Sequence, residues 1–272
     1  MKLVRSGALV AILAFLVSGL AARAESEPEL PALLFVITGQ SNAGQKGDAA
    51  QLAGPTAPGT FYYAPQHTGV RAWLPMQPYR GHFGVEQSFA RAVAEATGRT
   101  VLIAKTYLGG TSIIAWQPDA PTAQWRRDMA AVGNATKPAM YPRVRTLVAE
   151  ATAAWNGPVA LVGIIYVQTE RDSRYKYGAA RYEDNLRRLI NAWRADYGDD
   201  LPVVVMDSHT HMSNGGPVVH DAIFRVVKTT PGVQVVPTRD LPKQDAAHFS
   251  SAGLDELGRR FAAAWLSLEV GE

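Results

Sequence analysis

The stretch LLFVITGQSN, residues 33–42, joins a run of apolar and branched residues to a glycine, two amides and a serine. A continuous run of this kind is typical of a strand that is buried on both faces. Glycine directly after the strand permits a sharp turn, which would leave the Ser41 hydroxyl exposed beyond the strand's carboxyl end. A lone serine at such a point is also a common helix cap, so the stretch indicates a strand and leaves the role of Ser41 open.

Four further runs resemble the first and alternate with helical patterns. The predicted strands are residues 33–38, 100–105, 159–167, 203–206 and 233–236, and the predicted helices are residues 83–97, 140–155, 179–197, 218–228 and 252–268. Strands that alternate with helices imply right-handed crossovers and a parallel sheet between helical layers. We therefore predict an α/β fold, a three-layer α/β/α sandwich with a mainly parallel five-stranded sheet.

Two predicted connections, residues 39–82 and 107–139, are long for a compact domain. Loops of this length are usually functional or disordered. Both are rich in aromatic residues, among them Trp116, which could stack on the ring of a ligand such as a sugar. The alternative is that these aromatic side chains hold the loops against the core.

The first 24 residues are typical of an export signal. Lys2 and Arg5 precede an apolar run at residues 8–17, and Ala22-Arg23-Ala24 offers small residues for a signal peptidase. The apolar run is shorter than the roughly 20 residues that span a bilayer. We predict a signal peptide at residues 1–24, a single domain at residues 25–272, and a periplasmic or secreted protein. A retained anchor is the alternative.

Charge and composition argue against several classes of partner and of chemical site. Loss of residues 1–24 removes three basic and no acidic residues, which leaves 24 Lys and Arg against 24 Asp and Glu. A balanced charge without charge runs argues against a nucleic-acid partner. The chain has no cysteine, which excludes disulfides, thiolate nucleophiles and cysteine metal sites. Nothing in the composition indicates an oligomeric state.

Hydrogen-bond donors follow the second and third predicted strands. Gly109 and Gly110 can turn backbone N–H groups outward, and Gln168 carries a side-chain N–H donor. Such donors suit the stabilisation of an oxyanion, although an isolated Gly-Gly pair is otherwise a plain turn. Ligands of a parallel sheet bind beyond the carboxyl ends of its strands, where these donors and Ser41 are expected together.

Asp245 and His248 follow the fifth predicted strand. Residues three apart on a turn face the same way, so the carboxylate can accept a hydrogen bond from Nδ1 of the imidazole. That bond would leave Nε2 free to act as a base toward a hydroxyl. A serine, oxyanion donors and an Asp-His pair thus fall at one edge of one sheet, which indicates a catalytic site.

These segments resemble the SGNH hydrolases, and specifically the carbohydrate-esterase branch that includes sialate O-acetylesterases and acetylxylan esterases. The resemblance covers about residues 33–265. Its most specific motifs are residues 39–42 (GQSN), 83–86 (FGVE), Lys105 with 109–112 (GGTS), and 245–249 (DAAHF). It implies an SGNH/flavodoxin-like fold and a serine esterase that removes O-acetyl groups from a carbohydrate through an acyl-enzyme.

The resemblance also assigns roles to residues. Ser41 would be the nucleophile, and Asp245 and His248 would complete the triad. The oxyanion hole would consist of the N–H groups of Ser41 and Gly110 with the Gln168 side chain. The residues expected to contact the substrate are Gln40, Asn42, Glu170 and Trp116.

Two positions depart from the family's pattern. Ala43 stands where methionine is usual, and Thr169 stands where the family has glycine. A β-branched residue does not readily adopt positive φ, so we expect the loop that carries Gln168 to run differently here.

Three other functions remain open at this point. A zinc site would have to use His209, His211 and His248 with a carboxylate, but the serine chemistry needs no metal, and we expect no cofactor. The same serine could transfer the acetyl group to a sugar hydroxyl, as in an O-acetyltransferase. The domain could also be a glycan-binding module without activity. No motif identifies which acetylated glycan is the substrate.

Overall fold

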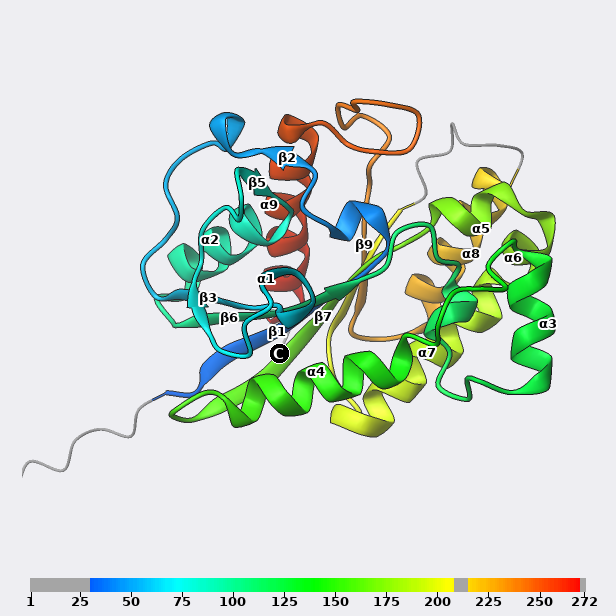
Figure 1. Ribbon diagram of the computed structural model, residues 1–272, viewed down its shortest axis with the longest axis horizontal. Helices are drawn as coiled ribbons and strands as arrows, with labels where there is room; N and C mark the ends of the chain where they lie inside the picture. Colours follow the sequence, from blue (N-terminus) through cyan, green and yellow to red (C-terminus); the bar gives the residue numbers. More distant parts are fainter. Residues whose placement is uncertain (1–29, 208–214, 270–272) are drawn as a thin grey trace, which may run out of the picture.

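The computed structural model describes residues 30–207 and 215–269, and its centre is a seven-stranded sheet with the order β4-β3-β6-β1-β7-β8-β9 (Figure 1). The strands are β1 (Ala32–Gly39), β3 (Thr60–Tyr63), β4 (Leu74–Pro75), β6 (Val101–Tyr107), β7 (Val159–Val167), β8 (Val203–Met206) and β9 (Val233–Val236). All neighbouring pairs are parallel except β3 with β4. The predicted mainly parallel sheet is therefore confirmed.

Helices cover both faces of the sheet, as the three-layer prediction requires. In Figure 1, α2 (Glu86–Thr97) and α9 (Ser251–Glu269) lie on one face, and α4 (Tyr141–Ala153), α7 (Tyr182–Tyr197) and α8 (Gly216–Thr229) lie on the other. The side chains of β1 alternate between the layers: Phe35 packs toward α2 and α9, whereas Val36 packs toward α4 and α7. Burial on both faces explains why the strand has no polar alternation.

The long connections contain short elements. The first holds the 3₁₀ turns η1 (Ser41–Ala43) and η2 (Ala49–Gln51), the helix α1 (Pro65–Thr68), and the paired strands β2 (Gly47–Asp48) and β5 (His82–Phe83). The second holds η3 (Ile113–Trp116) and α3 (Ala123–Ala131). Two further short helices, α5 (Glu170–Arg174) and α6 (Lys176–Ala180), follow β7.

The strand count differs from the prediction of five. β3 and β4 both lie in the connection that was expected to be a long loop, and β3 extends the sheet beside β6. The four residues of β3 are too short a run to be distinguished from a loop by periodicity. Its Tyr62 and Tyr63 are buried, so packing against the sheet, and not pattern, determines this strand.

Some predictions fall on residues that the structure does not describe. The signal peptide at residues 1–24 lies outside the described residues, as do His209 and His211. In the described part of the chain, no helix combines the length and apolar character needed to cross a membrane.

The sheet brings three chain segments together at one edge. Gly39, the last residue of β1, is in register with Tyr107 at the end of β6 and with Val167 at the end of β7. The segments that begin with Gln40, Leu108 and Gln168 therefore leave the sheet side by side, at the edge where parallel sheets bind their ligands.

Candidate active site

Ser41 is held in a tight turn at the end of β1. Gly39 has φ of 138°, and a Cβ atom at this position would come within 2.1 Å of the Val167 carbonyl oxygen. Only glycine allows this approach, because an L side chain would collide with β7. The turn makes Ser41 the first residue of η1 and leaves it half-buried.

His248 lies against this serine. The segment between β9 and α9 places His248 Nε2 at 3.0 Å from Ser41 Oγ and His248 Nδ1 at 2.8 Å from Asp245 Oδ2. Asp245 Oδ1 also accepts hydrogen bonds from the backbone N–H groups of Ala247 and His248. The structure thus brings together the three residues that the sequence proposes as a triad.

The carboxylate of Asp245 determines which ring nitrogen of His248 carries the hydrogen. Hydrogen bonds from the His248 side chain and from the Ala247 N–H lower the pKa of Asp245 to about 2. The ionised carboxylate accepts a proton donor, so the hydrogen of a neutral imidazole is held on Nδ1. Nε2 is then free to accept a hydrogen bond from the Ser41 hydroxyl.

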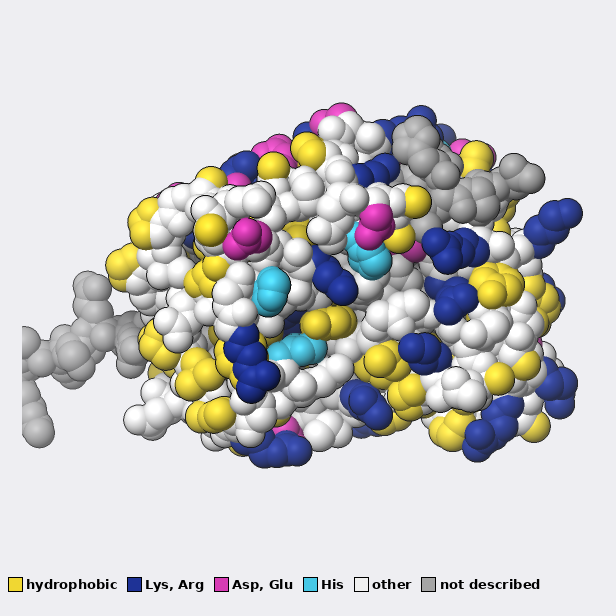
Figure 2. Space-filling view, turned by 45° about the horizontal axis from the view of Figure 1, so that its top comes forward, with side chains coloured by type: hydrophobic (Ala, Val, Ile, Leu, Met, Phe, Trp, Pro, Cys, Tyr) yellow, Lys and Arg dark blue, Asp and Glu magenta, His cyan; other side chains and the backbone are white. Residues whose placement is uncertain are grey.

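A cavity of about 320 Å³ opens above this serine and histidine. Its lining consists of Gln40, Ser41, Gly109, Gly110, Glu170, Arg171, Arg174, Ala247 and His248. A Cβ atom on Gly109 would lie 3.8 Å from the Ser41 Cβ, so the glycine loop passes directly beside the serine. On the face drawn in Figure 2, dark blue Lys and Arg patches are widespread, magenta Asp and Glu patches are few, and cyan histidines lie near the middle.

The backbone N–H groups of Ser41 and Gly110 are available to a ligand. Within residues 30–207 and 215–269, neither N–H donates to a protein acceptor. The Gly109 carbonyl, which belongs to the same peptide unit as the Gly110 N–H, accepts a hydrogen bond of 3.1 Å from Lys137 Nζ. Because C=O and N–H point in opposite directions in a trans peptide, Lys137 fixes the direction of the Gly110 N–H.

Gln168 does not join these donors, so the structure corrects the expectation that its side chain reaches the oxyanion. Gln168 is fully buried and is absent from the cavity lining. Its Nε2 donates to the Thr111 carbonyl at 3.0 Å and to Asp172 Oδ2 at 2.6 Å. Thr169 has φ of −161° and ψ of −30°, so the loop does not need a positive φ at this β-branched residue. Gln168 instead links the start of α5 to the loop after β6.

Of the four expected substrate contacts, Gln40 and Glu170 line the cavity, whereas Asn42 and Trp116 do not. Trp116 is fully buried in the core, where its Nε1 donates to Thr111 Oγ1 at 3.2 Å and its ring meets Tyr166 edge-on. The alternative interpretation of the loop aromatics, that they hold the loop to the core, is correct for this residue. A large indole supplies more stabilisation buried than exposed.

Asn42 is also fully buried and acts as a brace. Its Nδ2 donates to the Ala247 carbonyl at 2.9 Å, and its Oδ1 accepts from the Phe249 N–H at 3.2 Å. These two residues flank His248, so one amide holds the backbone on both sides of the imidazole.

Glu170 braces the serine in a similar way. Its carboxylate accepts hydrogen bonds from the side chains of Gln40 and Asn42, the residues on either side of Ser41, and from the Thr169 N–H at 3.0 Å. Burial raises the pKa of Glu170, and the hydrogen bonds from the Thr169 N–H and from Asn42 oppose that rise. Glu170 thus fixes the residues on both sides of Ser41.

Asp172 is a site residue that the sequence did not reveal. This buried carboxylate accepts hydrogen bonds from the Ser112 hydroxyl, the Ile113 N–H and Gln168, and therefore anchors the loop that carries Gly109 and Gly110. From sequence alone, an acidic residue two positions after Glu170 is expected to be a solvated surface charge. The contact becomes visible only in the fold, which places Asp172 next to residues 112–113.

Residues 30–207 and 215–269 contain no cluster of three or more His, Asp or Glu side chains that could hold a metal ion. His209 and His211, two of the three ligands of the zinc alternative, lie outside that part of the chain.

Comparison with solved structures shows the same fold in several proteins. A protein from Arabidopsis thaliana matches with a TM-score of 0.69 and 18% identity, covering 88% of this chain and 99% of that one. A carbohydrate acetylesterase from Xanthomonas citri matches with a TM-score of 0.64 and 19% identity, covering 88% of this chain and 57% of that one. NanS matches with a TM-score of 0.63 and 16% identity over 89% and 99% of the two chains.

Sequence comparison gives a family but no individual relative. A search of curated proteins finds no significant match. The family model described as carbohydrate esterase, sialic acid-specific acetylesterase matches residues 31–267. That match covers most of the chain and confirms the resemblance drawn from residues 39–42 and 245–249. The chain therefore belongs to the carbohydrate esterase, sialic acid-specific acetylesterase family, and it is a carboxylic ester hydrolase.

Proposed function

We propose that the protein hydrolyses O-acetyl esters of a carbohydrate, with Ser41 as nucleophile and His248, oriented by Asp245, as general base. The observation that carries this proposal is the 3.0 Å contact between Ser41 Oγ and His248 Nε2 at the floor of the cavity. A hydroxyl within this distance of an imidazole is within reach of direct proton transfer.

The first half of the reaction is acylation. His248 Nε2 accepts the proton of the Ser41 hydroxyl as Oγ attacks the acetyl carbonyl carbon. The resulting oxyanion accepts hydrogen bonds from the N–H groups of Ser41 and Gly110. The bond from the carbonyl carbon to the sugar oxygen then breaks, and the imidazolium gives its proton to that oxygen, which leaves the acetyl group on Ser41.

The second half is hydrolysis of the acyl-enzyme. Water gives a proton to His248 Nε2 and attacks the same carbonyl carbon. Collapse of the second tetrahedral intermediate releases acetate and returns the proton to Ser41. Asp245, with its pKa lowered to about 2, stays ionised throughout and stabilises the imidazolium in both halves.

The cavity lining supports a polar substrate. Ala247 contributes the only apolar side chain among the described lining residues, whereas Gln40, Glu170 and Arg174 offer hydrogen-bonding groups. A fatty acyl chain would need an apolar channel to leave water. A short acetyl group on a hydroxyl-rich sugar fits this lining better, in agreement with the family description.

The predicted signal peptide gives this activity a location. If residues 1–24 direct export, the substrate is a glycan in the periplasm or outside the cell. Mass measurement of the protein recovered after export, against the full chain, tests this: a mass that starts at residue 25 is expected, and an uncleaved chain in the cytoplasm contradicts it.

Hydrolysis of an acetylated xylo-oligosaccharide and of a chromogenic acetate ester tests the chemistry. Ser41→Ala should lower kcat/KM by about 10⁴-fold or more, because no other group can form the acyl-enzyme. Ser267→Ala, an exposed serine on α9, is the matched control and should retain full activity. Undiminished hydrolysis by Ser41→Ala would end the nucleophile assignment. Transfer of the acetyl group to an added sugar in preference to water would make the protein an acetyltransferase.

A further inference from the structure

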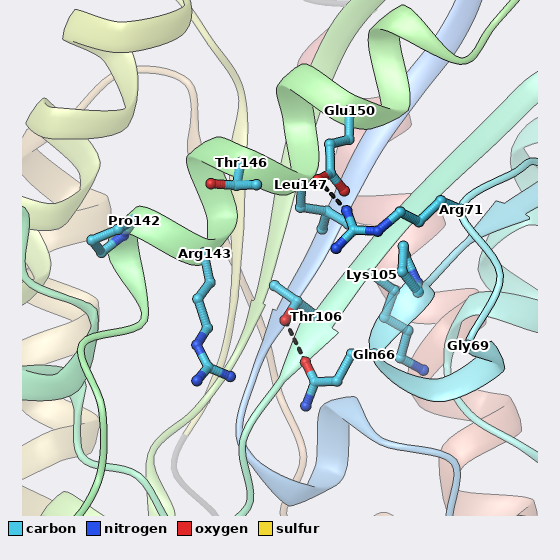
Figure 3. A pocket seen from close by; sticks show the side chains of 11 residues that line it. Gln66, Gly69, Arg71, Lys105, Thr106, Pro142, Arg143, Thr146, Leu147 and Glu150 are labelled. Carbon is cyan, nitrogen blue, oxygen red and sulfur yellow. Dashed lines mark hydrogen bonds and ion pairs between the residues drawn. The ribbon is translucent and has the colours of Figure 1, made fainter.

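A second cavity, of about 570 Å³, lies between α1 and α4 beside the end of β6 (Figure 3). Pro65 and Leu147 give it apolar walls, and Gln66 and Thr106 form its polar floor. Thr106 Oγ1 donates to Gln66 Oε1 at 2.6 Å, and Gln66 Nε2 donates to the Tyr107 carbonyl at 2.8 Å. A concave site of this size with apolar walls and a few polar groups is typical of a small-molecule site.

The charge around this cavity is not balanced. Lys105 is fully buried and paired with Glu86, and Arg71 is paired with Glu150. Arg143 forms no ion pair with any residue of the described ranges 30–207 and 215–269. Figure 3 shows its side chain reaching from α4 toward the level of Gln66, so one uncompensated guanidinium borders the cavity.

The second cavity lies close to the Ser41 cavity along the same chain segment. Thr106 lines the second cavity, and Gly109, three residues later, lines the first. Three residues span at most about 10 Å, so the linings of the two cavities approach each other along the short segment at Tyr107 and Leu108. Gln66 donates to the Tyr107 carbonyl, which joins this segment to the lining of the second cavity.

We propose that this second cavity is a subsite for an acidic sugar, whose carboxylate pairs with Arg143. The planar guanidinium matches a carboxylate with two parallel hydrogen bonds. Gln66 and Thr146, which also line the cavity, would bind hydroxyl groups, and Leu147 would pack against the apolar side of the sugar ring. The role of the subsite rests on the proposed function, because an acidic sugar bound here would present a neighbouring acetylated sugar of the same chain to Ser41.

Binding tests the subsite without any hydrolysis. In the Ser41→Ala chain, D-glucuronate should bind by calorimetry, whereas D-glucose, its neutral counterpart, should bind about tenfold more weakly or not at all. Adding Arg143→Gln should remove this preference. Arg145→Gln is the matched control, because Arg145 lies on the same helix, pairs with Asp196 and does not line the cavity.

Several outcomes overturn the inference. Equal binding of glucuronate and glucose, or no binding of glucuronate, rules out an acidic sugar as the ligand of this cavity. Tighter binding of inorganic phosphate than of glucuronate reassigns the site to another anion. Loss of glucuronate binding in Arg174→Gln but not in Arg143→Gln moves the anion site to the Ser41 cavity.

Catalysis then tests the role of the subsite. With acetylated oligosaccharides of galacturonic acid, Arg143→Gln should lower kcat/KM about tenfold, mainly through KM. With acetylated xylo-oligosaccharides and a chromogenic acetate, it should change little. An equal loss on all three substrates, or none on the acidic one, contradicts the subsite. If the wild-type chain hydrolyses no ester but glucuronate still binds through Arg143, the proposed function fails and the binding site stands.

Discussion

At the scale of a single residue, the Asn42 side chain connects the segment that carries Ser41 to the segment that carries His248. Its amide contacts Ala247 and Phe249 on either side of His248, and Glu170 accepts from the same amide. A misplacement of about 1 Å between reacting groups costs on the order of 10²-fold in rate. The position of the imidazole over Ser41 therefore depends on a side chain that does not line the Ser41 cavity.

We predict that Asn42→Ala lowers kcat on a chromogenic acetate by about 10–100-fold with little change in KM. The reason is that the segment around His248 loses two hydrogen bonds while the cavity lining is unchanged. Asn191→Ala, on the exposed face of α7, is the control and should behave as wild type. A rise in KM at constant kcat would show that Asn42 contacts the substrate instead.

The sequence predicts which residues come together in the candidate site better than it predicts the contacts that each side chain makes. Ser41, Asp245 and His248 each follow a strand, and parallel strands end at one edge, so their proximity follows from topology. The contacts of Gln168, Asn42 and Trp116 depend on which side of the backbone each side chain leaves. Those directions are set by packing against residues such as Asp172 and Tyr166, which are far away in sequence.

At the scale of elements, a buried ion pair joins α2 to β6. Lys105 and Glu86 are both fully buried, and Glu86 Oε1 also accepts from the Gly84 N–H at 3.0 Å. Burial lowers the pKa of Lys105, and the neighbouring carboxylate opposes that change. The pair explains why Lys105 stands in an otherwise apolar strand.

We predict that Lys105→Met lowers the free energy of unfolding by about 3–5 kcal/mol, because it leaves the buried Glu86 carboxylate without its cationic partner. Lys105→Met combined with Glu86→Gln should recover most of this loss, since the amide keeps an acceptor for Gly84. Urea unfolding of the wild type, both single variants and the double variant measures the coupling. Additive losses would show that the two side chains do not act as a pair.

A half-buried histidine couples α1 to the end of β6. The His67 ring stacks on Tyr107 with centroids 4.3 Å apart, and burial, with Lys105 nearby, lowers the pKa of His67 from 6.5 to about 4. As the pH falls below 6.5, the unfolded chain takes up a proton that the folded protein accepts only near pH 4. The stability contributed by neutral His67 is therefore present above pH 6.5 and lost progressively down to about pH 4.

We predict that His67→Phe reduces the acid-induced loss of stability between pH 7 and pH 4.5 by about 1–3 kcal/mol. Phenylalanine keeps the stacking on Tyr107 but cannot bind a proton. Urea unfolding at both pH values measures the difference, and His82→Phe, at an exposed histidine, is the control. Identical pH dependence in His67→Phe and wild type would contradict the assignment.

The elements themselves divide into those that sequence predicts and those that it does not. The predicted strands 159–167, 203–206 and 233–236 coincide with β7, β8 and β9, because each consists mainly of branched apolar residues. The elements α1, α3, β3 and β4 were not predicted, since they are short and are stabilised by packing. The rings of Tyr63 and Trp73, for example, lie 5.4 Å apart and join β3 to the segment before β4.

At the scale of the whole molecule, the candidate site joins the two ends of the described chain. Ser41 follows the first strand and His248 precedes the last helix, and they meet because β1 lies at the centre of the sheet. Asn42, Glu170 and the α2–α9 layer hold this arrangement. The site is therefore a property of the complete sheet, and a shift between β1 and the segment before α9 would separate the serine from its base.

Covalent labelling with a fluorophosphonate, which reacts only with an activated serine, tests this arrangement most directly. We predict one label per chain, located on Ser41 by peptide mass mapping, with loss of esterase activity in proportion to labelling. His248→Ala should abolish labelling because Ser41 is then no longer activated. Full esterase activity in a chain labelled at Ser41, or inactivation by a label on another serine, would contradict the account.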